Sequence, residues 1–168
     1  MTKTPPVSLA LIALHIPHRV FTHPGPVSSL EQAAAERGQT PEQVVRSLLF
    51  RLEEGRYVMV LAAGPAQISW AALRAHLGVS RLTTADRDEV QKVTGYAIGA
   101  VGPFGLLTPE SGPMPVLVDV SVAEQTEVSI GSGVRGTTVI LSTADLLAGL
   151  GDAVVVALRK DSTLNQTD

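Results

Sequence analysis

Two glycine-rich segments hold the residues of this sequence whose types and spacing best suit chemistry. Residues 94–105 read TGYAIGAVGPFG, and residues 131–136 read GSGVRG. Glycine adopts positive φ at little cost and lets another molecule approach main-chain N–H groups closely, so clustered glycines are typical of turns and of sites built from backbone. The two segments therefore predict a site lined by main-chain donors.

The second segment also satisfies a dinucleotide-binding motif. Gly131, Gly133 and Gly136 fit G-x-G-x-x-G, which in such proteins follows a strand and opens a helix whose N-terminus holds a pyrophosphate. Residues 137–141, TTVIL, are instead β-branched or apolar and predict a strand. We therefore expect a glycine-rich hairpin here. A cofactor-dependent oxidoreductase is the alternative, and finding a hairpin at this place would remove it.

Composition excludes several other kinds of site. The chain of 168 residues has no cysteine, which excludes disulfides, thiolate catalysis and cysteine zinc sites. Its four histidines, His15, His18, His23 and His76, lack the spacing of a helical metal site. Ser132 is the nearest candidate nucleophile, but it does not stand in G-x-S-x-G. We expect neither a metal nor a cofactor.

Charge and hydropathy narrow the partners. The formal net charge of −3 argues against a protein that holds nucleic acid by broad electrostatic attraction, although a local basic patch stays open. The apolar stretches are shorter than the roughly 20 residues of a membrane helix. No small-residue cleavage pattern follows the apolar run at 7–13. We expect a soluble, cytoplasmic protein with no membrane partner.

Helices and strand pairs alternate around these residues. Ser28 and Glu31 predict a capping box that opens a helix ending at Gly38, and Pro41 after Thr40 predicts a further helix. Residues 53–56, EEGR, predict a hairpin. The other expected helices cover residues 7–14, 70–77, 85–93 (starting from Thr84) and 144–150. The expected strands cover residues 19–22, 47–52, 57–62, 116–120, 127–130, 137–141 and 153–158.

This order lacks the steady strand–helix–strand rhythm of a parallel α/β fold. It predicts an α+β single domain with a mixed, mainly antiparallel sheet flanked by helices. A chain of this length can bury roughly two thirds of its unfolded surface without a metal or disulfide. We expect the domain to cover residues 1–160 and the polar residues 161–168 to form a loose tail.

Several separate segments, taken in order, resemble one known family. They are FTHP at 21–24 leading to SSLEQAA at 28–34, PEQVVRSLLF at 41–50, TGY at 94–96 through GAVGPFG at 99–105, and GSGVRG at 131–136 before DL at 145–146. Together they resemble the YbaK/EbsC family, the prolyl-tRNA-synthetase-associated editing domains, across residues 7–158. The resemblance implies that family's fold for the whole domain.

The resemblance also implies an activity. It points to a trans-editing aminoacyl-tRNA deacylase that hydrolyses the ester of a mischarged tRNA, most often a proline tRNA carrying alanine, cysteine or a small polar residue. A synthetase rejects a slightly smaller amino acid poorly, because one methylene is worth only ~1–3 kcal/mol, so a second hydrolytic site is useful. The implied partners are the aminoacyl-tRNA acceptor end and a prolyl-tRNA synthetase. The alternative is a non-catalytic tRNA-binding or nucleotide-binding module of the same fold.

Arg46 is the position at which the sequence departs from the family. A lysine commonly stands there and is thought to meet the phosphate or ribose of the tRNA end. Arginine keeps the charge and can grip phosphate with two donors, but it never gives up its proton and so cannot act as a base. We expect Arg46 to bind and position substrate. The alternative is a surface cation at the C-terminus of a helix.

The resemblance directs the expected site to Arg46 and the two glycine segments. We expect Arg46 and Gly99 to be the catalytic positions, acting through positioning and backbone hydrogen bonds, with proton transfer left to the tRNA ribose hydroxyl or a substrate side chain. The expected substrate-binding residues are His23, Ser47, Gly102, Pro103, Phe104, Ser132, Gly133 and Arg135. Structural roles are the alternatives: a strand-end hydrogen bond for His23, core or turn packing for Pro103 and Phe104, and support of the hairpin for Arg135.

Overall fold

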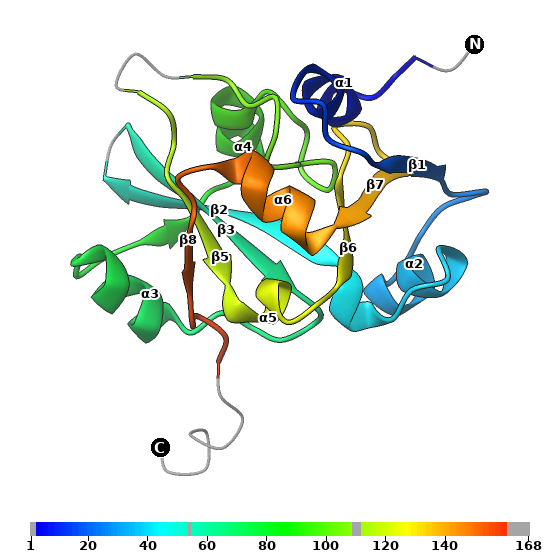
Figure 1. Ribbon diagram of the computed structural model, residues 1–168. Coiled ribbons are helices and arrows are strands. Elements are labelled where there is room, and N and C mark those ends of the chain that lie inside the picture. The colour runs from blue at the N-terminus through cyan, green and yellow to red at the C-terminus, as the bar shows by residue number, and fades with distance from the viewer. Residues whose placement is uncertain (1–2, 54, 109–111, 161–168) are drawn as a thin grey trace.

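The computed structural model describes residues 3–53, 55–108 and 112–160 (Figure 1). The strands are β1 (Arg19–Thr22), β2 (Val45–Glu53), β3 (Arg56–Ala63), β4 (Thr83–Thr84), β5 (Val116–Asp119), β6 (Glu127–Gly131), β7 (Thr137–Ser142) and β8 (Val154–Val156). The helices are α1 (Pro6–Ala13), α2 (Leu30–Glu36), α3 (Trp70–Leu77), α4 (Arg87–Thr94), α5 (Val120–Ala123) and α6 (Thr143–Leu150), with a 3₁₀ turn η1 (Pro41–Gln43).

These described strands form two sheets. The larger sheet has the order β4-β2-β3-β5-β8, and the smaller has the order β1-β7-β6. The pairs β3–β5 and β5–β8 are parallel, whereas the other pairs in both sheets are antiparallel. The sheets meet at an isolated bridge between Val44 and Ser129. The predicted α+β fold with mixed, mainly antiparallel pairing is therefore confirmed.

The larger sheet buries apolar side chains on both faces. Phe50, Val58 and Val60 face one side and pack with Leu73 of α3. Met59 and Leu61 face the other side, where the smaller sheet and helices α1, α5 and α6 cover them. Figure 1 shows α6 in front of the sheet. Because each fully buried leucine or methionine contributes about 1.5–3 kcal/mol, this packing fixes β2 and β3 firmly.

The structure corrects three details of the predicted helices, two of them at helix caps. Ser29, not Ser28, caps α2 by accepting a hydrogen bond from the Gln32 amide. Asp86 caps α4 in a capping box with Glu89, whereas Thr84, the predicted start, lies in β4. In each case the true cap is the residue whose oxygen reaches the N–H three positions on. The helix expected after Thr40 is only the single turn η1, which β2 follows after Val44.

A buried carboxylate fastens the end of the described chain to the sheet. Asp119 is fully buried, and its Oδ1 accepts hydrogen bonds from the amides of Leu158 (2.6 Å) and Arg159 (2.8 Å). Burial alone would raise the pKa of Asp119, but these bonds and those from Ser121 hold that pKa below its ordinary value. The carboxylate therefore fixes the segment that carries Lys160 beside the larger sheet. The predicted tail, residues 161–168, lies outside the described residues.

Among the described residues, no helix has both the length and the hydropathy that crossing a bilayer requires.

Candidate functional site

Two cavities flank one stretch of β2. The first, of about 810 Å³, lies between β2 and the start of α3, and we name it the Trp70 cavity. The second, of about 800 Å³, lies between β2, α2 and the β6–β7 hairpin, and we name it the Arg135 cavity. They share six lining residues, which are Arg46, Ser47, Leu48, Ile98, Gly99 and Val101. Both predicted catalytic positions thus lie on the shared wall.

The two glycine-rich segments contact each other directly. The amide of Gly133 donates to the carbonyl of Ala100 at 2.8 Å. A Cβ atom on Gly102 would lie 2.2 Å from the carbonyl oxygen of Gly131, and one on Gly131 would lie 2.0 Å from that of Val101. Only glycine fits at such an approach of two backbones. The contact supports the loop that carries Gly99 to the shared wall.

Gly99 differs from these packed glycines. Its φ is +88°, and a Cβ built on it would meet nothing within 4 Å. The positive φ favours glycine, while the open space leaves its backbone accessible from the cavities. Gly99 therefore exposes main chain to the cavities, as expected for a site lined by backbone.

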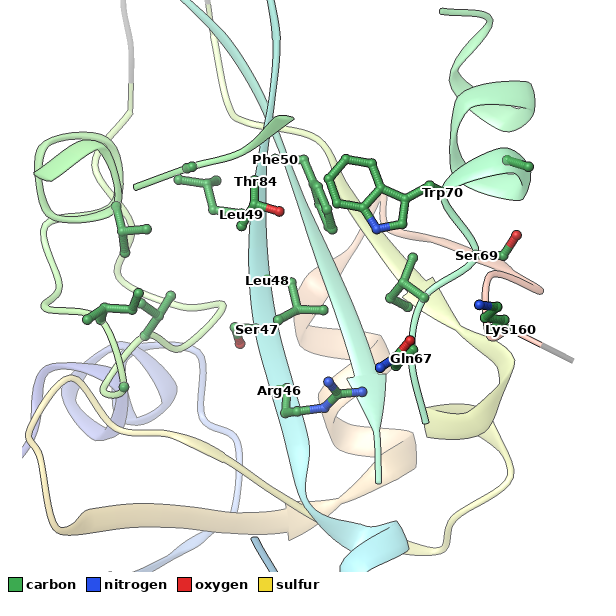
Figure 2. A pocket seen from close by; sticks show the side chains of 17 residues that line it. Arg46, Ser47, Leu48, Leu49, Phe50, Gln67, Ser69, Trp70, Thr84 and Lys160 are labelled. Carbon is green, nitrogen blue, oxygen red and sulfur yellow. The ribbon is translucent and has the colours of Figure 1, made fainter. Parts of the chain in front are cut away.

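Arg46 lies on β2, so the alternative that placed it at the C-terminus of a helix is wrong. Its side chain is half-buried, and Nη2 donates to the carbonyl oxygen of Ala66. Its Nε is buried and has no hydrogen-bond partner among the described residues. Burial lowers the pKa of Arg46, although a guanidinium stays protonated at neutral pH. Figure 2 shows the side chain directed from β2 toward the segment of Gln67.

Further polar groups line the shared wall and the Arg135 cavity without partners. Ser47 Oγ and Ser129 Oγ are buried and make no hydrogen bond to a described residue. Nε of Arg37 is also buried without a partner among the described residues, and burial lowers the pKa of Arg37. A buried polar group without a partner costs about 1–3 kcal/mol, so a ligand oxygen in this cavity would be stabilising. The Arg135 cavity therefore suits a polar ligand that offers oxygen acceptors.

His23 also lines the Arg135 cavity. Its Nδ1 is hydrogen-bonded to Glu36 Oε2, and its ring packs edge-on against Phe21 with centroids 5.0 Å apart. The hydrogen bond to His23 is the main cause that lowers the pKa of Glu36. The ring is therefore held in one orientation by a carboxylate, as the predicted strand-end role requires, and it also faces the site.

Arg135 joins the hairpin to the other glycine segment. Its Nη2 donates to the carbonyl of Ile98 at 3.0 Å, and it lines the cavity that bears its name. The residue thus supports the loop beside Gly99 and adds a third cation to a cavity that already holds Arg37 and Arg46.

Five predicted substrate-binding residues line neither cavity. They are Gly102, Pro103, Phe104, Ser132 and Gly133. Phe104 is buried in the core, and its carbonyl accepts from Tyr96 Oη at 2.7 Å. Ser132 is fully buried, and its Oγ bonds within the hairpin to the carbonyl of Thr137 at 2.7 Å. Gly102 and Gly133 hold the two glycine segments together, and the contact of all five residues with substrate stays a prediction.

Other lining residues were missed from the sequence. Trp70 opens α3 and reads as an ordinary amphipathic-helix residue, while Arg37 and Ser129 stand in segments without a glycine cluster. The only signal for Trp70 was a large aromatic directly after the N-cap Ser69, on a helix whose core residue is Leu73.

The G-x-G-x-x-G motif lies in a hairpin. Gly131 ends β6 and pairs with Thr138 of β7, so a strand and not a helix follows the motif. The oxidoreductase alternative, which required this motif to open a helix, is therefore removed. Among the described residues, no three histidine, aspartate or glutamate side chains gather as metal ligands would.

Comparison with known proteins agrees with this geometry. The family model of the aminoacyl-tRNA editing domain matches residues 24–148, which include β2 and both glycine segments. The chain belongs to this family. The predicted resemblance to the editing domains is confirmed.

The relatives of this editing domain fall into two kinds. The prolyl-tRNA editing protein ProX of Acetoanaerobium sticklandii is 28% identical over 134 residues, which cover 79% of this chain and 81% of ProX. The proline–tRNA ligase of Kosmotoga olearia is 41% identical over 80 residues, or 48% of this chain and 14% of the ligase. The chain thus spans only about one seventh of the ligases that it matches.

A solved structure has the same fold over almost its whole length. It is the crystal structure of a proposed trans-editing enzyme for prolyl-tRNA synthetase, with a TM-score of 0.82 and 28% identity, covering 93% of this chain and 96% of that one.

Proposed function

We propose that this editing domain is a trans-editing aminoacyl-tRNA deacylase, which hydrolyses the ester between a small non-cognate amino acid and the 3′ end of a proline tRNA. Family membership and the ProX relative, which matches over most of both chains, support this activity. We further propose that it acts in the cytoplasm on the aminoacyl-tRNA acceptor end, with a prolyl-tRNA synthetase as the source of mischarged tRNA.

One observation carries the proposal, namely the placement of Arg46. Its half-buried guanidinium lies on the wall between two cavities, with a buried Nε that has no partner among the described residues. A planar cation with a free donor binds a phosphate or an ester oxygen well, and the open backbone of Gly99 lines the same wall. An ester that joins a ribose to an amino acid would place one part in each cavity.

Ester hydrolysis needs a water, a proton acceptor and donors for the oxyanion. Arg46 and the backbone near Gly99 supply donors, and Arg46 cannot accept the proton because it stays charged. In this proposal the tRNA ribose hydroxyl or a substrate side chain helps to transfer the proton. His23, which Glu36 holds in place, brings an imidazole to the Arg135 cavity, where it assists this transfer.

The polarity of the Arg135 cavity bears on which amino acid it accepts. The unpartnered hydroxyls of Ser47 and Ser129 favour a small side chain that is polar or leaves room for water. Such a cavity would complement a synthetase that admits amino acids smaller than proline, because it would act as the second of two sieves.

The test is deacylation of proline tRNA charged separately with alanine, cysteine, serine and proline. We expect faster hydrolysis of at least one mischarged species, with prolyl-tRNA spared. Binding of these tRNAs without any acceleration of hydrolysis would refute the deacylase and leave a binding module of the same fold.

A further inference from the structure

Trp70 is the single tryptophan of the chain, and it lies at the mouth of the Trp70 cavity. Trp70 is 40% exposed, whereas Phe50, on which it packs, is 4% exposed. The two rings meet edge to face, with centroids 5.4 Å apart and planes at 90°. Figure 2 shows the indole standing beside Phe50 above the cavity. The indole is thus fixed on one side and open on the other.

The local structure holds Trp70 in this place. It is the first residue of α3, directly after Ser69, whose hydroxyl accepts from the Ala72 amide at 3.1 Å. The amide of Ser69 donates to the carbonyl of Leu158 at 2.7 Å, which ties the start of α3 to the segment fastened by Asp119. A single exposed aromatic is common on protein surfaces and means little alone. An anchored one inside a cavity offers a prepared stacking surface.

The charge of the Trp70 cavity points to the ligand. Of the described residues that line it, Arg46 and Lys160 are cations and none is acidic, although the whole chain carries a net charge of −3. Figure 2 shows both cations and Gln67 at the end of the cavity away from Phe50. An aromatic platform at one end and cations at the other match a nucleotide, whose base stacks and whose phosphate is anionic.

The spacing along β2 fits this arrangement. Arg46, Leu48 and Phe50 alternate along the strand and so share one face, with Arg46 and Phe50 about 13 Å apart at the rise of an extended strand. Leu48 supplies an apolar floor between the two ends.

We infer that the Trp70 cavity binds an unpaired nucleobase stacked on Trp70, with the sugar and phosphate of that nucleotide directed toward Arg46. The inference rests on the proposed function for the identity of the nucleotide, the 3′ end of tRNA. That orientation directs the aminoacyl ester past Arg46 and Gly99 into the Arg135 cavity. Trp70 is a binding and positioning residue, and it takes no part in the chemical step.

Because the chain has one tryptophan, its fluorescence reports this site alone. We expect the trinucleotide CCA and adenosine monophosphate to quench the indole emission on titration, and ribose 5-phosphate, which has no base, to leave it unchanged. If CCA binds more tightly than adenosine monophosphate, the site recognises an RNA end. If the two bind equally tightly, the site recognises a free nucleotide. No quenching by either base-bearing probe at millimolar concentration, or equal quenching by ribose 5-phosphate, would overturn the inference.

Variants give a second, independent measurement. With fluorescently labelled CCA, Trp70→Ala should weaken binding by about 5- to 150-fold, the equivalent of the ~1–3 kcal/mol that such a substitution costs a stacked base. Trp70→Phe, which keeps a ring, should retain most of the affinity. The control is Leu9→Ala, because Leu9 is 56% exposed and lines neither cavity. Equal affinity of wild type and folded Trp70→Ala would refute the stacking role.

Deacylation separates this inference from the proposed function. In Trp70→Ala we expect the KM for mischarged tRNA to rise while the single-turnover rate at saturation stays near that of the wild type. This pattern is expected when the lost contact binds the substrate and the transition state equally well. Active enzyme without quenching would sink the inference and leave the function standing. Quenching without hydrolysis would refute the proposed function and leave the nucleobase site standing.

Discussion

The substitution Gly131→Ala tests the contact between the two glycine segments. The new Cβ would lie 2.0 Å from the carbonyl oxygen of Val101 and 3.0 Å from that of Ala100. Ordinary contacts begin near 3.4 Å, so the two backbones would have to separate by more than an ångström. No flexible side chain can absorb this shift, because the three atoms nearest to the Cβ all belong to the main chain.

The expected loss has two sources. Overpacking costs about 1–3 kcal/mol, and the strained hydrogen bond from Gly133 to Ala100 contributes about 1 kcal/mol more. A total near 3 kcal/mol corresponds to a fall in Tm of about 6–12 °C for a chain of this size. The loop that carries Gly99 would move with Ala100, so we also expect slower deacylation.

Thermal and urea unfolding measure this effect, and Gly25→Ala is the matched control. A Cβ at Gly25 meets nothing within 4 Å, and its φ lies outside the left-handed region, so its stability should change by less than about 0.5 kcal/mol. If Gly131→Ala were as stable as this control, the two segments would not pack as described, and the support of Gly99 would need another explanation.

Two further substitutions probe the elements that position the Trp70 cavity. Asp119→Asn should cost about 2–4 kcal/mol in urea unfolding, because the carboxylate accepts charge-assisted bonds from the chain near Leu158. Since the folded pKa of Asp119 is lowered, the wild-type contribution is complete above the unfolded value of about 3.9 and is lost as pH falls through the folded value. The variant should therefore show a flatter loss of stability below about pH 4, and an unchanged acid limb would contradict the assignment. Ser69→Ala removes the cap of α3 and should cost about 1 kcal/mol, with a change in the emission of Trp70; an unchanged free energy of unfolding would show that the cap is dispensable.

The fold could be predicted from the sequence where local signals and packing agree. The hairpin at Gly55, the strand after the GSGVRG segment and the end of α2 just before Gly38 all follow from local backbone preferences. The division of the strands into two sheets could not be predicted, because it depends on long-range pairing such as that of β1 with β7. The cap of α4 was misplaced because Thr84 and Asp86 are both good caps, and pairing of Thr84 with Phe50 decides between them.

The candidate site was predictable only in part. Arg46 and Gly99 were named from a resemblance, and the structure brings both to one wall of two cavities. Trp70, Arg37 and Ser129 were not foreseen, because each stands in a different element and only tertiary packing brings them to a cavity. Phe104 was named from the same resemblance; its ring lies in the core, as the alternative of core packing describes, and its contact with substrate stays a prediction.

The most direct measurement is the single-turnover deacylation rate of mischarged proline tRNA with Arg46→Ala and with Arg81→Ala. Arg81 is exposed and lines neither cavity, so its loss removes the same charge away from the site. Removing one preorganised donor to a developing oxyanion typically costs about 10²–10³ in rate, so we predict a loss of about 100-fold or more for Arg46→Ala. The Arg81→Ala enzyme should stay within twofold of wild type. Equal rates for the two variants, both folded, would contradict the central role of Arg46.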